Sequence, residues 1–168
     1  MALADELGQR REEEAAAYRT SIASRLAAEP NLNAQAEILE EALSARPRDE
    51  YLEREMARVR ERQKEVKAVA ARARNLEKQQ AFEAAVKEWE SLSALYPQYP
   101  NLQDYIGKAR AAWQNQRAQA KSLWIKRIAG ALQDADHATA LRLLSDAGRE
   151  FPVDPELNEL AAKAKEQA

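Results

Sequence analysis

The residues whose types and spacing could do chemistry lie mainly between Tyr105 and Gln133. This stretch has no acidic residue, but it contains six basic residues and the tryptophans Trp113 and Trp124. A basic helix that also carries aromatic side chains can receive an acidic segment of a partner protein. We therefore expect a partner-binding site on this stretch. Its candidate residues are Tyr105, Arg110, Trp113, Arg117 and Lys121.

Two other interpretations of this stretch stay open. In the second, the basic residues pair with acidic residues of the neighbouring short helices. Both tryptophans then lie in the core, with Trp113 the less buried, because Trp113 and Trp124 fall on the apolar stripe of their helix. In the third, the basic residues bind a nucleic-acid backbone. The net charge of −2 does not favour the third interpretation, so no nucleic-acid partner is expected.

The sequence contains no pattern that indicates catalysis or metal binding. His137 is the only histidine and cysteine is absent, so a metal ion would lack its usual nitrogen and sulfur ligands. Acidic residues such as Glu37, Glu40 and Glu41 fall on predicted solvent-exposed helix faces, and nothing marks a pocket that would shift a pKa. The four glycines are scattered and form no phosphate-binding loop. We therefore expect no enzyme activity, no cofactor and no metal ion.

The composition is typical of long helices. Charged residues make up 32% of the chain, whereas there are only 4 Gly and 6 Pro, and no segment alternates apolar and polar residues as a strand does. No apolar stretch approaches the roughly 18 residues that a membrane span needs, so no membrane insertion is expected. The N-terminus is charged from Asp5 onward, unlike a signal peptide, and we expect a cytoplasmic protein.

A nine-residue motif recurs along the chain, and we refer to it as the repeat motif. Its copies read LADELGQRR from Leu3, LEREMARVR from Leu52, LQDYIGKAR from Leu102 and, more weakly, LNELAAKAK from Leu157. The copies start at intervals of 49, 50 and 55 residues, which indicates a helical repeat protein. Because the chain opens and closes within this motif, we expect it to be a fragment of a larger protein.

Apolar residues spaced by three and four positions predict seven helices, in which long and short ones alternate. They cover residues 3–28, 34–46, 50–79, 81–95, 101–132, 136–150 and 155–167. Asn33 is expected to cap the second helix, and Asp134 or Asp136 the sixth. The apolar stripe of the fifth helix is predicted to include Leu123 and Ile128.

The short helices share a second spacing, in which a small residue, a bulky residue and a small or apolar residue precede a proline. The sets are Ala85, Trp89, Leu92 and Pro97, then Ala140, Leu144, Ala147 and Pro152, and a degenerate set of Gln35, Leu39, Ala42 and Pro47. This spacing resembles the second helix of the tetratricopeptide (TPR) repeat, and Trp124, Ile128 and Ala131 resemble its first helix. The period of about 50 residues exceeds the usual 34 or so, and Gln80 and Ala135 stand where the family places glycine.

The resemblance implies an all-α, TPR-like solenoid of about three helical hairpins. We expect one helical-repeat domain over residues 1–168, with repeats at 3–47, 52–97 and 102–152 and a cap or truncated helix at 155–168. It also implies a non-catalytic scaffold that binds a protein or peptide, similar to helical segments attached to bacterial signalling kinases and envelope scaffolds. In the first interpretation of residues 105–133, this partner is acidic. The alternative is a structural spacer or a homo-oligomerisation module, which the heptad-like spacing of residues 52–73 favours.

Overall fold

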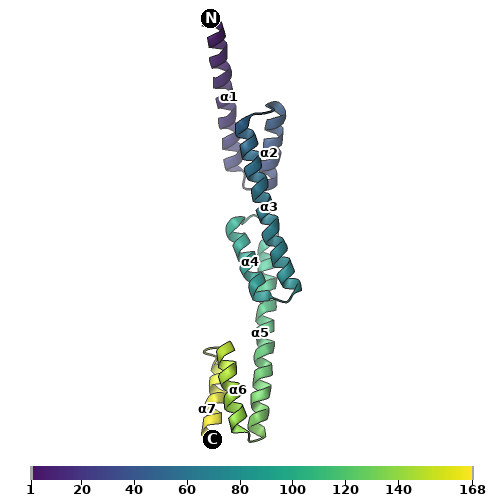
Figure 1. The fold of residues 1–168 in the computed structure, drawn as a ribbon, viewed down its shortest axis with the longest axis vertical. Helices are drawn as coiled ribbons and strands as arrows, with labels where there is room; N and C mark the ends of the chain where they lie inside the picture. Colours follow the sequence, from purple (N-terminus) through teal and green to yellow (C-terminus); the bar gives the residue numbers. More distant parts are fainter. Residues whose placement is uncertain (1, 168) are drawn as a thin grey trace. The chain divides into compact units, whose positions relative to one another are not determined.

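The computed structural model describes residues 2–167, which form seven α-helices and no strand (Figure 1). The helices are α1 (Ala2–Ala28), α2 (Leu32–Ala45), α3 (Glu50–Lys78), α4 (Phe82–Leu95), α5 (Leu102–Gln133), α6 (His137–Glu150) and α7 (Pro155–Gln167). The predicted all-α class and the seven helices are confirmed. Each long helix is continuous, and Gln63, which interrupts the apolar stripe of α3, does not break it.

The chain divides into two compact units, one up to Gly107 and one from Lys108 onward, and the boundary falls within α5. They are called the first and second units below. That residues 1–168 form one solenoid domain stays a prediction.

In the first unit, α3 serves two short helices. Its N-terminal half lies beside α2 and its C-terminal half beside α4 (Figure 1). The side chains of Leu52 and Trp89 are fully buried there. The start of α2 is also joined directly to the end of α4. The backbone N–H of Leu32 in α2 donates a hydrogen bond at 3.1 Å to the hydroxyl oxygen of Tyr96, the residue after α4. This arrangement follows from an α3 stripe that is apolar at both ends, so that each half can bury its own partner.

The core of the second unit is built from the C-terminal half of α5 together with α6 and α7. Its buried residues are Ile128, Ala131, Ala140, Leu143, Leu144, Ala147, Phe151, Leu157 and Ala164. Trp124 and Ile125 are half-buried against this core. The prediction that Leu123 belongs to the stripe is wrong, because 62% of Leu123 is exposed. Leu123 precedes Ile128 by five residues, which places the two about 140° apart around the helix.

Asparagine and aspartate side chains cap several helices. The predicted cap Asn33 is wrong, because α2 begins two residues earlier and Asn31 caps it by accepting hydrogen bonds from the N–H groups of Asn33 and Ala34. The earlier start places Leu32 inside the helix, where it is buried. Asp136, one of the two predicted alternatives, caps α6 by accepting from the N–H of Thr139.

Most turns between the helices contain a residue with a left-handed backbone, and none of these residues is glycine. The residues with positive φ are Arg48, Gln80, Asn101, Ala135 and Val153. Gln80 and Ala135, where the resemblance to the TPR repeat predicts glycine, thus have a left-handed backbone without the residue that adopts it most easily. For residues with a Cβ this backbone costs roughly 1–2 kcal/mol each.

Glycine at position 153, in the turn between α6 and α7, is expected to stabilise the second unit. Val153 is β-branched, has a φ of 60° and is 90% exposed, so that Val153→Gly removes backbone strain and loses almost no packing. We expect it to raise the free energy of unfolding of the second unit by about 0.5–1 kcal/mol. Urea denaturation followed by circular dichroism measures the change. Val153→Ala, which keeps the Cβ but not the branch, should fall between parent and glycine variant, and a glycine variant less stable than the parent would contradict the account.

Candidate functional site

The structure places one predicted site residue, Tyr105, in the packing of the first unit. The ring of Tyr105 stacks on Trp89 with centroids 4.9 Å apart and planes at 15°. The guanidinium of Arg74 lies 5.7 Å from the centroid of the same ring and donates a hydrogen bond to the Tyr99 hydroxyl at 3.1 Å. Tyr105 is therefore already held by an aromatic and cationic cluster, and only part of its surface is exposed.

The other four predicted residues lie in the part of α5 that belongs to the second unit. The guanidinium of Arg117 lies 6.0 Å from the Trp113 ring centroid and 4.9 Å from that of Phe151, both within reach of a cation–π interaction. The Nζ of Lys121 lies 2.9 Å from Asp154 and 2.9 Å from Glu156. Arg110 is exposed on the same helix. Lys121 thus pairs with acidic residues of its own unit, as the second interpretation of this stretch expects. That Lys121 also binds a partner protein stays a prediction.

The ion pairs of Lys121 with Asp154 and Glu156 shift the pKa values of groups at the start of α7. The hydrogen bond from Lys121 lowers the pKa of Asp154 below its ordinary value of 3.8, and the backbone N–H of Leu157 lowers it further. In return, Asp154 and then Glu156 raise the pKa of Lys121 above 10.5. A lowered carboxyl pKa stabilises the folded state above about pH 3.8, and this contribution is lost as the pH falls through the folded-state pKa. A raised lysine pKa contributes below pH 10.5 and is lost as the pH rises through the folded-state pKa.

Removing the charge of Asp154 is expected to weaken the acid sensitivity of the second unit. Asp154→Asn keeps an oxygen that can cap α7 but cannot lose a proton. We expect a modestly lower melting temperature than the parent at pH 7 and a smaller decrease than the parent between pH 4 and pH 2, because less ionic stabilisation remains to be lost. Thermal melting followed by circular dichroism across this pH range measures both effects. Equal decreases in parent and variant would show that the Lys121 pair does not contribute.

A similar ion pair occurs in the first unit. Asp49 precedes Leu52 by three residues, as Asp154 precedes Leu157, and it caps α3. Arg19 of α1 reaches it with an Nε–Oδ2 distance of 3.1 Å. Burial acts to raise the pKa of Asp49, but the N–H of Leu52, the side chain of Arg19 and the N–H of Tyr51 together lower it. In each unit, a basic residue of one helix thus forms an ion pair with the aspartate that precedes a later helix, α3 in the first unit and α7 in the second. We assign these ion pairs a structural role.

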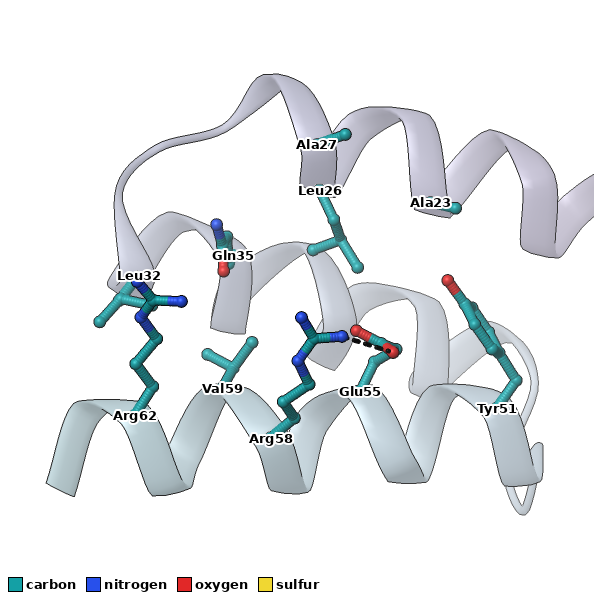
Figure 2. Close-up of a pocket in the computed structure, with 10 residues that line it drawn as sticks. All are labelled: Ala23, Leu26, Ala27, Leu32, Gln35, Tyr51, Glu55, Arg58, Val59 and Arg62. Carbon is teal, nitrogen blue, oxygen red and sulfur yellow. Dashed lines mark ion pairs between the residues drawn. The ribbon is translucent and has the colours of Figure 1, made fainter. Parts of the chain in front are cut away.

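The sequence did not indicate a groove that lies in the first unit, and we call it the α1–α3 groove. It has a volume of about 320 Å³ (Figure 2). Its lining residues are Ala23, Leu26 and Ala27 of α1, Leu32 and Gln35 of α2, and Tyr51, Glu55, Arg58, Val59 and Arg62 of α3. In Figure 2 the side chains of Leu26 and Arg58 extend into the space between α1 and α3. The groove is therefore lined both by apolar side chains, such as Leu26, and by charged side chains, such as Arg58.

Two arginines one helical turn apart on α3, Arg58 and Arg62, line the α1–α3 groove. Arg58 pairs with Glu55 at 3.6 Å, and both Arg58 and Glu55 line the groove. Arg62 donates a hydrogen bond to the backbone oxygen of Leu95 at 2.9 Å. A neighbouring hollow shares Arg58 and Arg62 and extends to Leu95, so the open surface continues along α3. In the sequence these arginines looked like ordinary exposed charges, because the groove appears only when three helices are assembled.

Within residues 2–167 no group of histidine and acidic side chains is placed to hold a metal ion. The buried Nδ1 atom of His137 has no hydrogen-bond partner in that part of the chain. None of the described helices is both long enough and apolar enough to cross a membrane.

Comparison with known proteins identifies no relative of this chain. The resemblance to TPR repeats rests on the residue spacings given above and stays a prediction. No protein-family model, curated protein or solved structure matches this chain.

Proposed function

We propose that the chain is a non-catalytic protein–protein interaction module of TPR-like helical hairpins, which binds a segment of a partner protein in the α1–α3 groove. The observation that supports this is the groove itself, whose lining combines aliphatic side chains with two arginines. Its volume of about 320 Å³ lies at the lower end of the range for ligand clefts, roughly 300–1,000 Å³. A scaffold of hairpins commonly presents such a concave surface.

The lining suggests the chemistry of the partner segment. Leu26, which lines the groove and is only partly buried, offers a contact for an aliphatic side chain. The ion pair between Arg58 and Glu55 is solvent-exposed on the arginine side, and exposed pairs of this kind contribute little, about 0–1 kcal/mol. Arg58 can therefore exchange Glu55 for a carboxylate of the partner at small cost. A short segment with an aliphatic residue next to an acidic residue fits both features.

Selection from a peptide-display library against the full chain tests the proposal. The peptides selected on the parent are then titrated against two groove variants, Ala27→Trp, which fills the groove, and Arg58→Glu, which reverses a charge of the lining. Matched controls are Ser21→Trp and Arg60→Glu, on the same helices but outside the groove lining. We expect affinity losses of at least about tenfold in the groove variants and unchanged affinity in the controls.

Two results would contradict the proposal. One is a set of peptides that binds all four variants equally. The other is concentration-dependent self-association of the parent that Ala27→Trp abolishes, measured by light scattering, because the groove would then hold a second copy of the chain.

A further inference from the structure

In three of its four copies, the repeat motif contributes its leading apolar side chains to a buried surface. Its leading leucines Leu52, Leu102 and Leu157 are buried, and so are Met56 and Ile106 four residues after the first two. In α1 the corresponding residues are exposed, Leu3 at 75% and Leu7 at 53%. Every residue from Ala2 to Glu14 is exposed in the described chain. In Figure 1 this half of α1 extends beyond α2 within the first unit.

The structure shows what kind of element covers the motif in the other copies. It is the short helix that comes before it in the chain. Helix α2 packs on the start of α3, and α6 packs on α7. In the α5 copy, Tyr105 stacks on Trp89 of α4. Each covering helix has about four turns, carries the small–bulky–small spacing described above and ends before a proline.

One position of the α1 copy differs from all the others. The eighth residue of the motif is buried and apolar in three copies, as Val59, Ala109 and Ala164. In α1 it is Arg10, which is exposed. A helix that covers Leu3 and Leu7 must therefore also accommodate a guanidinium, and a carboxylate is the group that does so best.

The covered copies indicate where on the covering helix that carboxylate would lie. Gln35 of α2 and Val59 of α3 line the same groove, and Ala140 of α6 and Ala164 of α7 belong to the same core. Gln35 and Ala140 are the first residues of the small–bulky–small spacing. The eighth motif residue therefore shares a groove or a core with the first residue of that spacing in the covering helix.

We propose that the Leu3, Leu7 and Arg10 face of α1 is a second interaction surface, which binds an amphipathic helix of a partner protein. The partner helix has the spacing of α2, α4 and α6, but with an acidic residue at the first, small position, where it pairs with Arg10. This surface is separate from the α1–α3 groove, so it does not depend on the function proposed for that groove.

A synthetic peptide that copies α2, residues Asn31–Pro47, serves as the probe. It is compared with the same peptide carrying Gln35→Glu, and both are labelled with a fluorophore and titrated into the full chain by anisotropy. The face variant is Leu3→Glu with Leu7→Glu. Its matched control is Gln9→Glu with Ala16→Glu, two exposed positions on the opposite side of α1. Since all four positions are exposed, each variant is expected to fold, which circular dichroism checks.

We expect the Gln35→Glu peptide to bind the parent and the control variant with similar affinity, and the face variant at least about tenfold more weakly. Arg10→Ala should remove the advantage of the Gln35→Glu peptide over the native peptide. Three results would overturn the proposal. They are no binding of either peptide at about 1 mM, equal binding to face and control variants, or dimerisation of the parent that only the face variant abolishes, which would make a second copy the occupant.

Discussion

Trp89→Ala is expected to lower the free energy of unfolding of the first unit by about 3–5 kcal/mol, the usual cost of truncating a buried tryptophan. The side chain has no exposed surface. Its Nε1 donates a hydrogen bond to Glu77 at 3.0 Å, and its ring stacks on Tyr105 at 4.9 Å. The substitution removes the stacking and the hydrogen bond and leaves a cavity between α3, α4 and the start of α5. Urea denaturation, with hydrogen exchange to assign the loss to the first unit, measures the effect.

Two further variants separate the contributions at this position. Trp89→Phe keeps an aromatic ring but removes the donor to Glu77, so the loss should be clearly smaller than that of Trp89→Ala. Glu77→Ala keeps the ring but leaves Nε1 without its acceptor, which costs about 1–3 kcal/mol. An alanine variant at position 89 that unfolds like the parent would show that Trp89 is not the central residue of the α3–α4 packing.

Ile128→Ala and Leu123→Ala are expected to differ sharply although both residues lie on α5. Ile128 is fully buried in the core of the second unit, and its truncation should cost about 2–5 kcal/mol. Leu123 is mostly exposed, and its truncation should change the free energy of unfolding by no more than about 0.5 kcal/mol. Denaturation curves of the two variants under the same conditions test the difference. Similar losses would mean that the stripe of α5 faces another direction.

The helices could be predicted closely because their signals are local. Steps of three and four between apolar residues placed all seven helices, and prolines such as Pro47 and Pro152 marked the turns. The errors come from tertiary packing. Burial of Leu32 moves the start of α2, so the cap is Asn31 rather than Asn33. Leu123 fits the spacing of three and four but lies about 140° around the helix from the buried Ile128. Which side of α5 is buried depends on where α6 and α7 pack.

The candidate site could be predicted only in part. The sequence showed the basic and aromatic residues of α5, but it did not show that Lys121 reaches Asp154 or that Tyr105 stacks on Trp89. These contacts join residues that are far apart in the chain. The α1–α3 groove was missed for the same reason, because Leu26 and Arg58 belong to different helices and neither has an unusual neighbour in the sequence.

The sharing of α3 between two short helices has a consequence for how such a chain can lengthen during evolution. A gene duplication that copied one hairpin from turn to turn would leave half of a long helix without a short partner. A duplication with both breakpoints in the middle of long helices would instead insert half a helix, a short helix and another half, so that every apolar stripe stays covered. The expected unit of duplication is therefore the interval of about 50 residues between the midpoints of successive long helices. Such a unit begins and ends inside a helix rather than in a loop.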